Sequence, residues 1–348
     1  MKAHMLRYAA TAAALTAVAA VLAIASDKQP IQMTGAGATF PAPIYQKWFN
    51  DYQSIGNVQI NYQPNGSGGG IKGVTEGTVD FGASDAILSK EQMDTFKSKN
   101  GGHGLLTFPT VLGAVVPSYN VPGVTAELSF TGPVLADIFL GKIKKWNDPA
   151  LAKINPGVKL PDLDILVAHR SDGSGTTFCF TDYLSKVSTE WEKGPGRNAA
   201  ISWPAGLGAK GNDGVTGLLK QQAGALGYVE LIYAVKNHLP YGKVQNAAKE
   251  FIKADLKSVS AAAAAMKESA ADTQVSLTDA PGKGVYPIST FTWLLVPDTF
   301  KDADKAAAMR GFLKWAVTKG QDEVEPLDYA KLPKAVAEKV EKRIGLIK

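Results

Sequence analysis

The chain has 348 residues, of which 45% are hydrophobic and 20% charged, and its formal net charge at pH 7 is +5. This length suffices for two lobes that each bury a hydrophobic core. The basic residues are spread along the chain and form no stripe interleaved with aromatic residues, which argues against nucleic-acid binding.

The N-terminus has the pattern of an export signal. Lys2 and Arg7 precede an apolar run over 9–25, and Ala23-Ile24-Ala25 offers an A-x-A cleavage site. The run is shorter than the ~20 residues that a membrane-spanning helix needs, and polar sequence follows at once. We therefore predict that 1–25 is a cleaved signal peptide and that the mature chain is exported and soluble. A retained membrane anchor is the alternative.

Short apolar strands alternate with amphipathic helical patterns along the rest of the chain, which is typical of an α/β architecture. The expected β-type segments are 31–33, 58–62, 79–85 (a strand and then a turn), 105–116, 165–168 and 287–296. The expected helical segments are 44–52, 71–75, 134–140, 174–186, 215–222, 259–266, 302–319 and 333–344.

Two of the β-type segments, 105–116 and 287–296, are long and stand where the chain can change lobes. Two such crossings would form a hinge, with a cleft between the lobes, which is the usual place for a small ligand. We therefore expect a discontinuous first lobe, 26–112 plus 286–348, and a second lobe, 113–285.

The segment Arg170–Thr177 (R-S-D-G-S-G-T-T) follows an apolar strand and precedes a helical pattern. Such a turn presents backbone N–H groups, hydroxyls and the positive end of a helix dipole at one point, which suits a small oxyanion. Three further segments share this character: Thr34–Pro41, Asn65–Gly70 and Val79–Asp85, the last of which ends in an acid. Each alone fits an ordinary helix cap or loop, but their recurrence after strands indicates a shared anion site.

The sequence does not match the competing motifs. The Walker pattern lacks a lysine in register, the dinucleotide fingerprint lacks its third glycine after Gly35 and Gly37, and the nucleophile elbow fails at Ser67 and Ser174. The histidines show no metal-ligand spacing, so we expect no metal, no cofactor and no catalysis. Cys179 is the only cysteine, which excludes an internal disulfide, and we expect it to be a small buried side chain.

Several of these motifs resemble those of a known family. Thr34–Pro43, Thr78–Asp85, Leu140–Trp146, Arg170–Thr176 and Gly208–Gly214 are similar to motifs of the periplasmic phosphate-binding proteins that serve phosphate-specific ABC importers. The resemblance covers nearly the whole mature chain. It implies a two-lobed periplasmic binding fold of type II that closes on one inorganic phosphate. It also implies a periplasmic location, a monomeric chain, and membrane permease subunits of the importer as partners.

The resemblance further implies the residues that contact phosphate: Thr39, the backbone N–H of Phe40, Ser67, Asp85, Arg170, Ser174, the backbone N–H of Gly175, and Thr176. Asp172 corresponds to the acid that pairs with the arginine. Two positions depart from the family's pattern. Gly68 stands where the family often has a second serine, and His169 stands where a second arginine can occur; on a strand, its side chain would point away from Arg170.

Asp85 would let such a site choose its anion. Phosphate keeps a proton near neutral pH and sulfate does not, so an ionised Asp85 accepts a hydrogen bond from phosphate and repels sulfate. We therefore expect high-affinity phosphate binding without catalysis. Arsenate is protonated like phosphate and stays an alternative ligand. A phosphate-ester hydrolase with Ser174 or Thr176 as nucleophile is a further alternative, although the chain lacks a positioned histidine base or a P-loop lysine.

Overall fold

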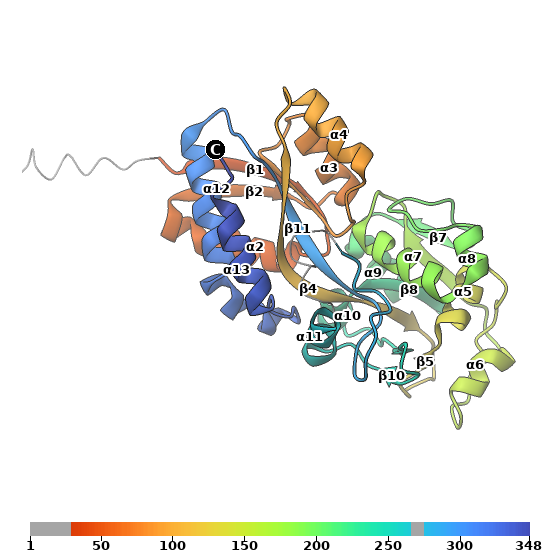
Figure 1. Cartoon of the computed structure of the whole chain (residues 1–348). Helices are drawn as coiled ribbons and strands as arrows, with labels where there is room; N and C mark the ends of the chain where they lie inside the picture. The colour runs from red at the N-terminus through yellow and green to blue at the C-terminus, as the bar shows by residue number, and fades with distance from the viewer. Residues whose placement is uncertain (1–28, 266–274) are drawn as a thin grey trace, which may run out of the picture.

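The structure, a computed structural model, describes residues 29–265 and 275–348 and has the α/β architecture expected from the sequence. The predicted signal peptide, 1–25, lies outside the described residues. Figure 1 shows two groups of helices and strands that are joined by long strands crossing the middle of the molecule. Within the described ranges, no helix is long and apolar enough to cross a membrane.

Eight strands form one mixed sheet. Neighbours pair in parallel at both ends of the sheet, whereas the two long central strands run antiparallel to their neighbours. The spatial order is β2 (Val58–Gln63), β1 (Ile31–Gly37), β3 (Phe81–Ser84), β11 (Ser289–Pro297), β4 (Leu105–Asn120), β8 (Ala225–Glu230), β6 (Leu166–Arg170) and β7 (Leu207–Ala209). A smaller sheet has the order β10 (Phe251–Ile252), β9 (Lys243–Gln245) and β5 (Ser129–Phe130).

The long strand β4 belongs to both parts of the large sheet. Its residues from Leu105 to Ala114 pair with β11, and those from Val115 to Asn120 pair with β8. We call β2, β1, β3, β11 and the first part of β4 the first half, and the second part of β4, β8, β6 and β7 the second half. The change of partner lies close to the lobe boundary expected at 112–113, while the exact lobe boundaries stay a prediction.

Helices of the first half lie on both sides of β4 in Figure 1, with α2, α12 and α13 on one side and α3 and α4 on the other. Their bounds are α2 (Ala42–Gly56), α3 (Ser67–Thr75), α4 (Lys90–Lys99), α12 (Ala303–Ala316) and α13 (Lys334–Ile344), with 3₁₀ turns η2 (Lys319–Glu323) and η3 (Glu325–Leu327). Aromatic side chains hold α2 against α12: Phe49 packs on Phe312 with ring centroids 5.2 Å apart, and Trp48 packs on Trp315 at 6.4 Å.

The second half carries α5 (Gly132–Phe139), α6 (Pro149–Ile154), α7 (Gly175–Val187), α8 (Thr189–Lys193), α9 (Gly211–Gln221), α10 (Leu231–Lys236) and α11 (Leu256–Ala264). Phe180 of α7 stacks on Tyr228 of β8 with centroids 4.4 Å apart, and Cys179 is buried beside it. The buried apolar residues of the two halves form one continuous cluster. The strands β4 and β11 are buried along nearly their whole length, so their side chains join the two cores.

Candidate functional site

The segment Arg170–Thr177, which we call the cradle, forms the strand, turn and helix start that its sequence predicts. β6 ends at Arg170, and α7 begins at Gly175 with Ser174 as its N-cap. The Ser174 hydroxyl oxygen accepts the Thr177 N–H at 3.0 Å, which fixes the first turn of the helix. The positive end of the α7 dipole therefore lies beside the Arg170 side chain.

Arg170 is almost fully buried and makes a two-pronged contact with Asp172. Its Nε and Nη2 donate to the two carboxylate oxygens of Asp172 at 2.7 and 2.6 Å, and its Nη1 donates to the Thr176 hydroxyl oxygen at 3.3 Å. Burial alone would raise the pKa of Asp172, but the hydrogen bonds and charge of Arg170 lower it below its ordinary value. The ionised pair holds the planar guanidinium in one orientation.

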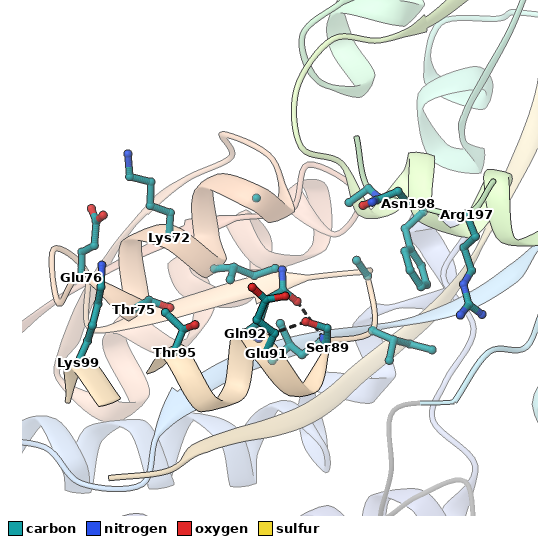
Figure 2. A pocket seen from close by; sticks show the side chains of 17 residues that line it. Lys72, Thr75, Glu76, Ser89, Glu91, Gln92, Thr95, Lys99, Arg197 and Asn198 are labelled. Carbon is teal, nitrogen blue, oxygen red and sulfur yellow. Dashed lines mark hydrogen bonds between the residues drawn. The ribbon is translucent and has the colours of Figure 1, made fainter. Parts of the chain in front are cut away.

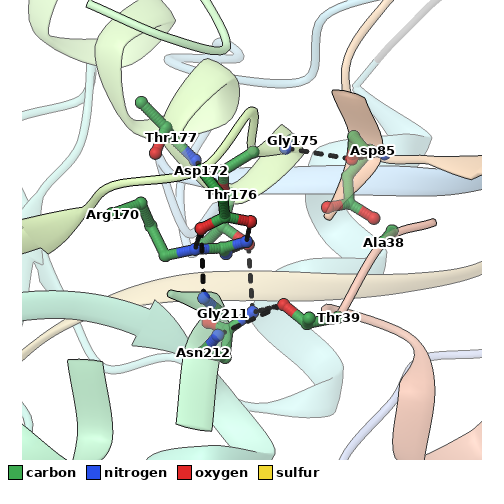
Figure 3. A network of polar contacts seen from close by, with 12 residues as sticks. Ala38, Thr39, Asp85, Arg170, Asp172, Gly175, Thr176, Thr177, Gly211 and Asn212 are labelled. Carbon is green, nitrogen blue, oxygen red and sulfur yellow. Dashed lines mark hydrogen bonds and ion pairs between the residues drawn. The ribbon is translucent and has the colours of Figure 1, made fainter. Parts of the chain in front are cut away.

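Residues on three turns of the first half face the cradle (Figure 3). Thr39 lies just before α2, and its hydroxyl oxygen accepts the backbone N–H of Asn212 at 3.2 Å. Ser67 begins α3, and its hydroxyl oxygen accepts the N–H of Gly175 at 3.0 Å and that of Asp85 at 3.3 Å. The predicted site residues are therefore brought together, although they come from opposite halves of the sheet. Phe40, next to Thr39, is fully buried there.

Two glycines allow the halves to meet this closely. A Cβ atom on Gly175 would lie 2.5 Å from the Asp85 carboxylate, and one on Gly68 would lie 3.1 Å from the Cα of Gly173. The Gly68 N–H also donates to the Gly173 carbonyl at 2.8 Å. This close approach of the two backbones explains why glycine suits position 68.

Asp85 is only 2% exposed, and its Oδ1 accepts the Thr292 hydroxyl at 2.8 Å. Burial raises the pKa of Asp85 to about 7, an effect that the Thr292 hydrogen bond and the Arg170 charge offset only in part. The other oxygen, Oδ2, lies against Gly175 at the start of α7. Near neutral pH the cradle therefore faces a carboxyl group that gains or loses its proton readily.

This pKa predicts that anion-free protein loses stability as pH rises from about 4 to about 7. The folded state binds the Asp85 proton more tightly than the unfolded chain, in which the Asp85 pKa has its ordinary value of 3.8. The contribution of this proton to folding stability is therefore complete below pH 3.8. It is lost as pH rises through the folded-state value of about 7. Asp85→Asn should flatten this decline because asparagine does not ionise. Thermal unfolding from pH 4 to pH 8 tests this, and equal slopes for both proteins would contradict it.

Comparison with known proteins agrees with the sequence motifs. A family model described as a PBP superfamily domain matches residues 23–319. The phosphate-binding protein PstS of Xylella fastidiosa is 42% identical over 319 residues, which cover 91% of this chain and 86% of that protein. The phosphate-binding protein PstS of Pasteurella multocida is 44% identical over 311 residues, which cover 89% and 88%. This chain belongs to the PstS family.

Solved structures agree on the fold of this PstS family member. A phosphate-binding protein from Stenotrophomonas maltophilia matches with a TM-score of 0.68 at 22% identity, covering 90% of this chain and 93% of that one. A high-affinity periplasmic phosphate-binding protein, PfluDING, was solved with phosphate bound and matches with a TM-score of 0.69 at 22% identity and the same coverage. The periplasmic binding fold that the resemblance implied is therefore confirmed.

The structure adds site residues that the sequence analysis did not single out. The Gly211 N–H donates to Asp172 at 3.0 Å, and the Tyr233 hydroxyl donates to the Thr39 carbonyl at 2.6 Å. Gly211 and Asn212 lie in the stretch G-A-K-G-N-D-G, which carried the family resemblance and could have pointed to them. His169 points away from the Arg170 guanidinium, as strand alternation predicts, because its ring stacks on Trp203 at 4.8 Å.

A groove of about 770 Å³ lies beside the cradle, between α3, α4 and the second-half segment 197–199 (Figure 2). Its lining carries Lys72, Lys99 and Arg197 together with Glu76 and Glu91. Because these charges have both signs and the groove is open, it is a weaker candidate for an anion site than the buried cradle. In the part of the chain that the structure describes, no group of three His, Cys, Asp or Glu residues is placed to hold a metal ion.

Proposed function

We propose that this chain binds inorganic phosphate with high affinity in the periplasm and delivers it to the membrane permease subunits of an ABC importer. The names of its relatives, which are phosphate-binding proteins at 42% and 44% identity, support the ligand. The observation that carries the proposal is one buried acid, Asp85, placed against a cradle of hydrogen-bond donors. The lobes that close on the ligand would be 26–112 plus 286–348 and 113–285.

The donors of the site would surround the phosphate oxygens. They are the Arg170 guanidinium, the hydroxyls of Thr39, Ser67, Ser174 and Thr176, and the backbone N–H groups of Phe40 and Gly175. The Gly175 N–H donates to Ser67 in the structure, so a phosphate oxygen would share or replace that acceptor. Asp85 would be the acceptor for the proton that phosphate keeps.

The energetics suit a receptor that must also release its ligand. Hydrogen bonds to charged groups contribute about 1.5–3 kcal/mol each, so their sum over this site would exceed any plausible affinity. Desolvation of the anion and closure of the lobes must therefore offset much of it. Because Asp172 balances part of the Arg170 charge, the open lobes would let phosphate leave.

The ligand is tested by identifying the anion that co-purifies with the protein expressed without added phosphate buffer. We expect inorganic phosphate in near-equimolar amount, whereas sulfate or an organic phosphate would contradict the proposal. Titration of the stripped protein with arsenate then tests the alternative protonated ligand. A phosphatase assay with and without divalent metals tests the hydrolase, for which we expect no turnover.

We further propose that residues 1–25 are removed on export, so that the mature protein begins at Ser26, and that it acts as a monomer. Mass spectrometry of protein released from the periplasm reads the cleavage site directly. Light scattering on the same sample gives the oligomeric state. A retained N-terminus in a membrane fraction would favour an anchor instead.

A further inference from the structure

Asn212 is fully buried and sits in the first turn of α9, where it touches both halves of the site (Figure 3). Its amide oxygen accepts the N–H of Glu230, at the end of β8, at 2.9 Å. This bond sets the orientation of the amide, because only the oxygen can accept a backbone hydrogen. The amide nitrogen must therefore point the other way, toward the anion site.

Both hydrogens of that nitrogen are used on hydroxyl oxygens of the site. Nδ2 of Asn212 lies 2.9 Å from Oγ1 of Thr39 and 3.2 Å from Oγ1 of Thr176. Thr39 belongs to the first half, whereas Thr176 and Asn212 belong to the second. The Asn212 side chain thus links the two halves and contacts one threonine hydroxyl of the site in each half.

The hydroxyl oxygens that Asn212 contacts each receive a second donor. Thr39 also accepts the backbone N–H of Asn212 at 3.2 Å, and Thr176 also accepts Nη1 of Arg170 at 3.3 Å. A hydroxyl oxygen has two acceptor lone pairs and one hydrogen to donate. With both lone pairs engaged, each hydroxyl can offer only its hydrogen to a ligand.

Ser67 follows the same rule, since its oxygen accepts the N–H groups of Gly175 and Asp85 at 3.0 and 3.3 Å. The hydroxyls of Thr39 and Thr176 can then accept no hydrogen bond from the ligand, and Ser67 is closed in the same way only while the Gly175 N–H keeps it as acceptor. The acceptor for a hydrogen on a bound anion is then Asp85. The hydroxyls of Thr39 and Thr176 do not compete for that hydrogen as long as Asn212 donates to their oxygens.

We infer that Asn212 is a positioning residue that fixes the Thr39 and Thr176 hydroxyls as donors. The hydrogen bond from a protonated ligand is thereby directed to Asp85. The inference rests on the proposed function, because it concerns how the same site reads a protonated oxyanion. It assigns Asn212 no contact with the ligand. Its effect is exerted through the two hydroxyls.

Two substitutions separate this role from simple packing. Asn212→Ala removes the amide and leaves the hydroxyls free to rotate, so phosphate affinity should fall about tenfold, as for one or two lost hydrogen bonds. Asn212→Asp keeps the shape and the bond to Glu230 but places an acceptor opposite both hydroxyls, which turns their hydrogens away from the ligand. Its phosphate affinity should be at least about tenfold lower still.

A packing role predicts the reverse order, because alanine leaves a cavity and an unpaired Glu230 N–H while aspartate does not. Aspartate also adds a negative charge, and the same pair of variants in a Thr176→Val background separates this effect. If Asn212 acts through the hydroxyls, the gap in phosphate affinity between Asn212→Ala and Asn212→Asp narrows at least about threefold in that background. If the gap comes from charge alone, it keeps its size.

Calorimetric titration with inorganic phosphate at pH 8 measures all four variants, and thermal unfolding checks that each is folded. Asn246→Ala is the matched control, since Asn246 is a buried asparagine that bonds the backbone of Glu250 and Val285 away from the cradle. It should lower stability and leave phosphate affinity unchanged. The inference would be overturned if Asn212→Asp bound phosphate as tightly as Asn212→Ala. It would also be overturned if the difference in affinity between these variants were unchanged in the Thr176→Val background. Wild-type protein that binds no phosphate would instead overturn the proposed function.

Discussion

Asp85→Asn is expected to reduce the preference for phosphate over sulfate at least about a hundredfold, since a site that pairs a ligand hydroxyl can reject an analogue lacking it by about 10⁴–10⁵. The carboxylate accepts a hydrogen bond from the protonated phosphate and repels the unprotonated sulfate dianion. The asparagine amide can turn its NH₂ toward sulfate, so that repulsion is lost. Titrations with both anions at pH 8, above the Asp85 pKa of about 7, measure the ratio.

Asp172→Asn is the matched control for this change. It makes the same substitution at the other acid of the site, whose carboxylate is held by Arg170. Because Asp172 faces the guanidinium and the Gly211 N–H, its replacement should shift the affinities for phosphate and sulfate together. A phosphate-to-sulfate ratio that Asp85→Asn leaves unchanged would show that Asp85 does not read the ligand's proton.

Arg170→Ala is expected to lower phosphate affinity at least about tenfold, since each lost charge-assisted bond contributes about 1.5–3 kcal/mol. It also leaves the partly buried Asp172 carboxylate without its partner, which destabilises the fold and repels the anion. Titration calorimetry and thermal unfolding measure the two effects separately. A loss smaller than tenfold would mean that the helix dipole and the neutral donors dominate binding.

The double variant Arg170→Ala with Asp172→Asn distinguishes the lost contact from the unpaired acid. Removing the stranded charge should restore most of the stability while phosphate affinity stays low. Arg170→Lys keeps the charge but loses the planar fork, so we expect affinity between that of the wild type and that of alanine. If the double variant binds as well as the wild type, Arg170 acts on phosphate only by balancing Asp172.

The sequence predicted the strands and helices that have a clear apolar period, and it missed those that do not. Helix α4 buries only Phe96 among charged and polar neighbours, so it shows no helical pattern of apolar residues. The short strands β7, β9 and β10 have two or three residues each, too few for an alternation to register. The long apolar strands β4 and β11 stood out in the sequence because both of their faces are buried.

The predicted residues of the candidate site lie together in the structure, but their supporting partners depend on the fold. Thr292 bonds Asp85 across 207 positions of sequence, and this contact exists only because β11 pairs antiparallel with β3. Asn212 lies 173 positions from Thr39 in the sequence and contacts it because α9 packs against β8 and β6. No local pattern marks such pairs. Turn motifs therefore predicted which residues could hold an anion, whereas tertiary pairing decided which side chains orient them.

The central claim is that the cradle and Asp85 together select a protonated oxyanion, and a competition titration of the stripped wild-type protein tests it most directly. Phosphate is titrated at pH 8 with sulfate present at about a thousandfold excess. We expect sulfate to displace roughly a tenth of the bound phosphate or less, given a discrimination of about 10⁴ or more. Displacement in proportion to the sulfate excess would contradict the account.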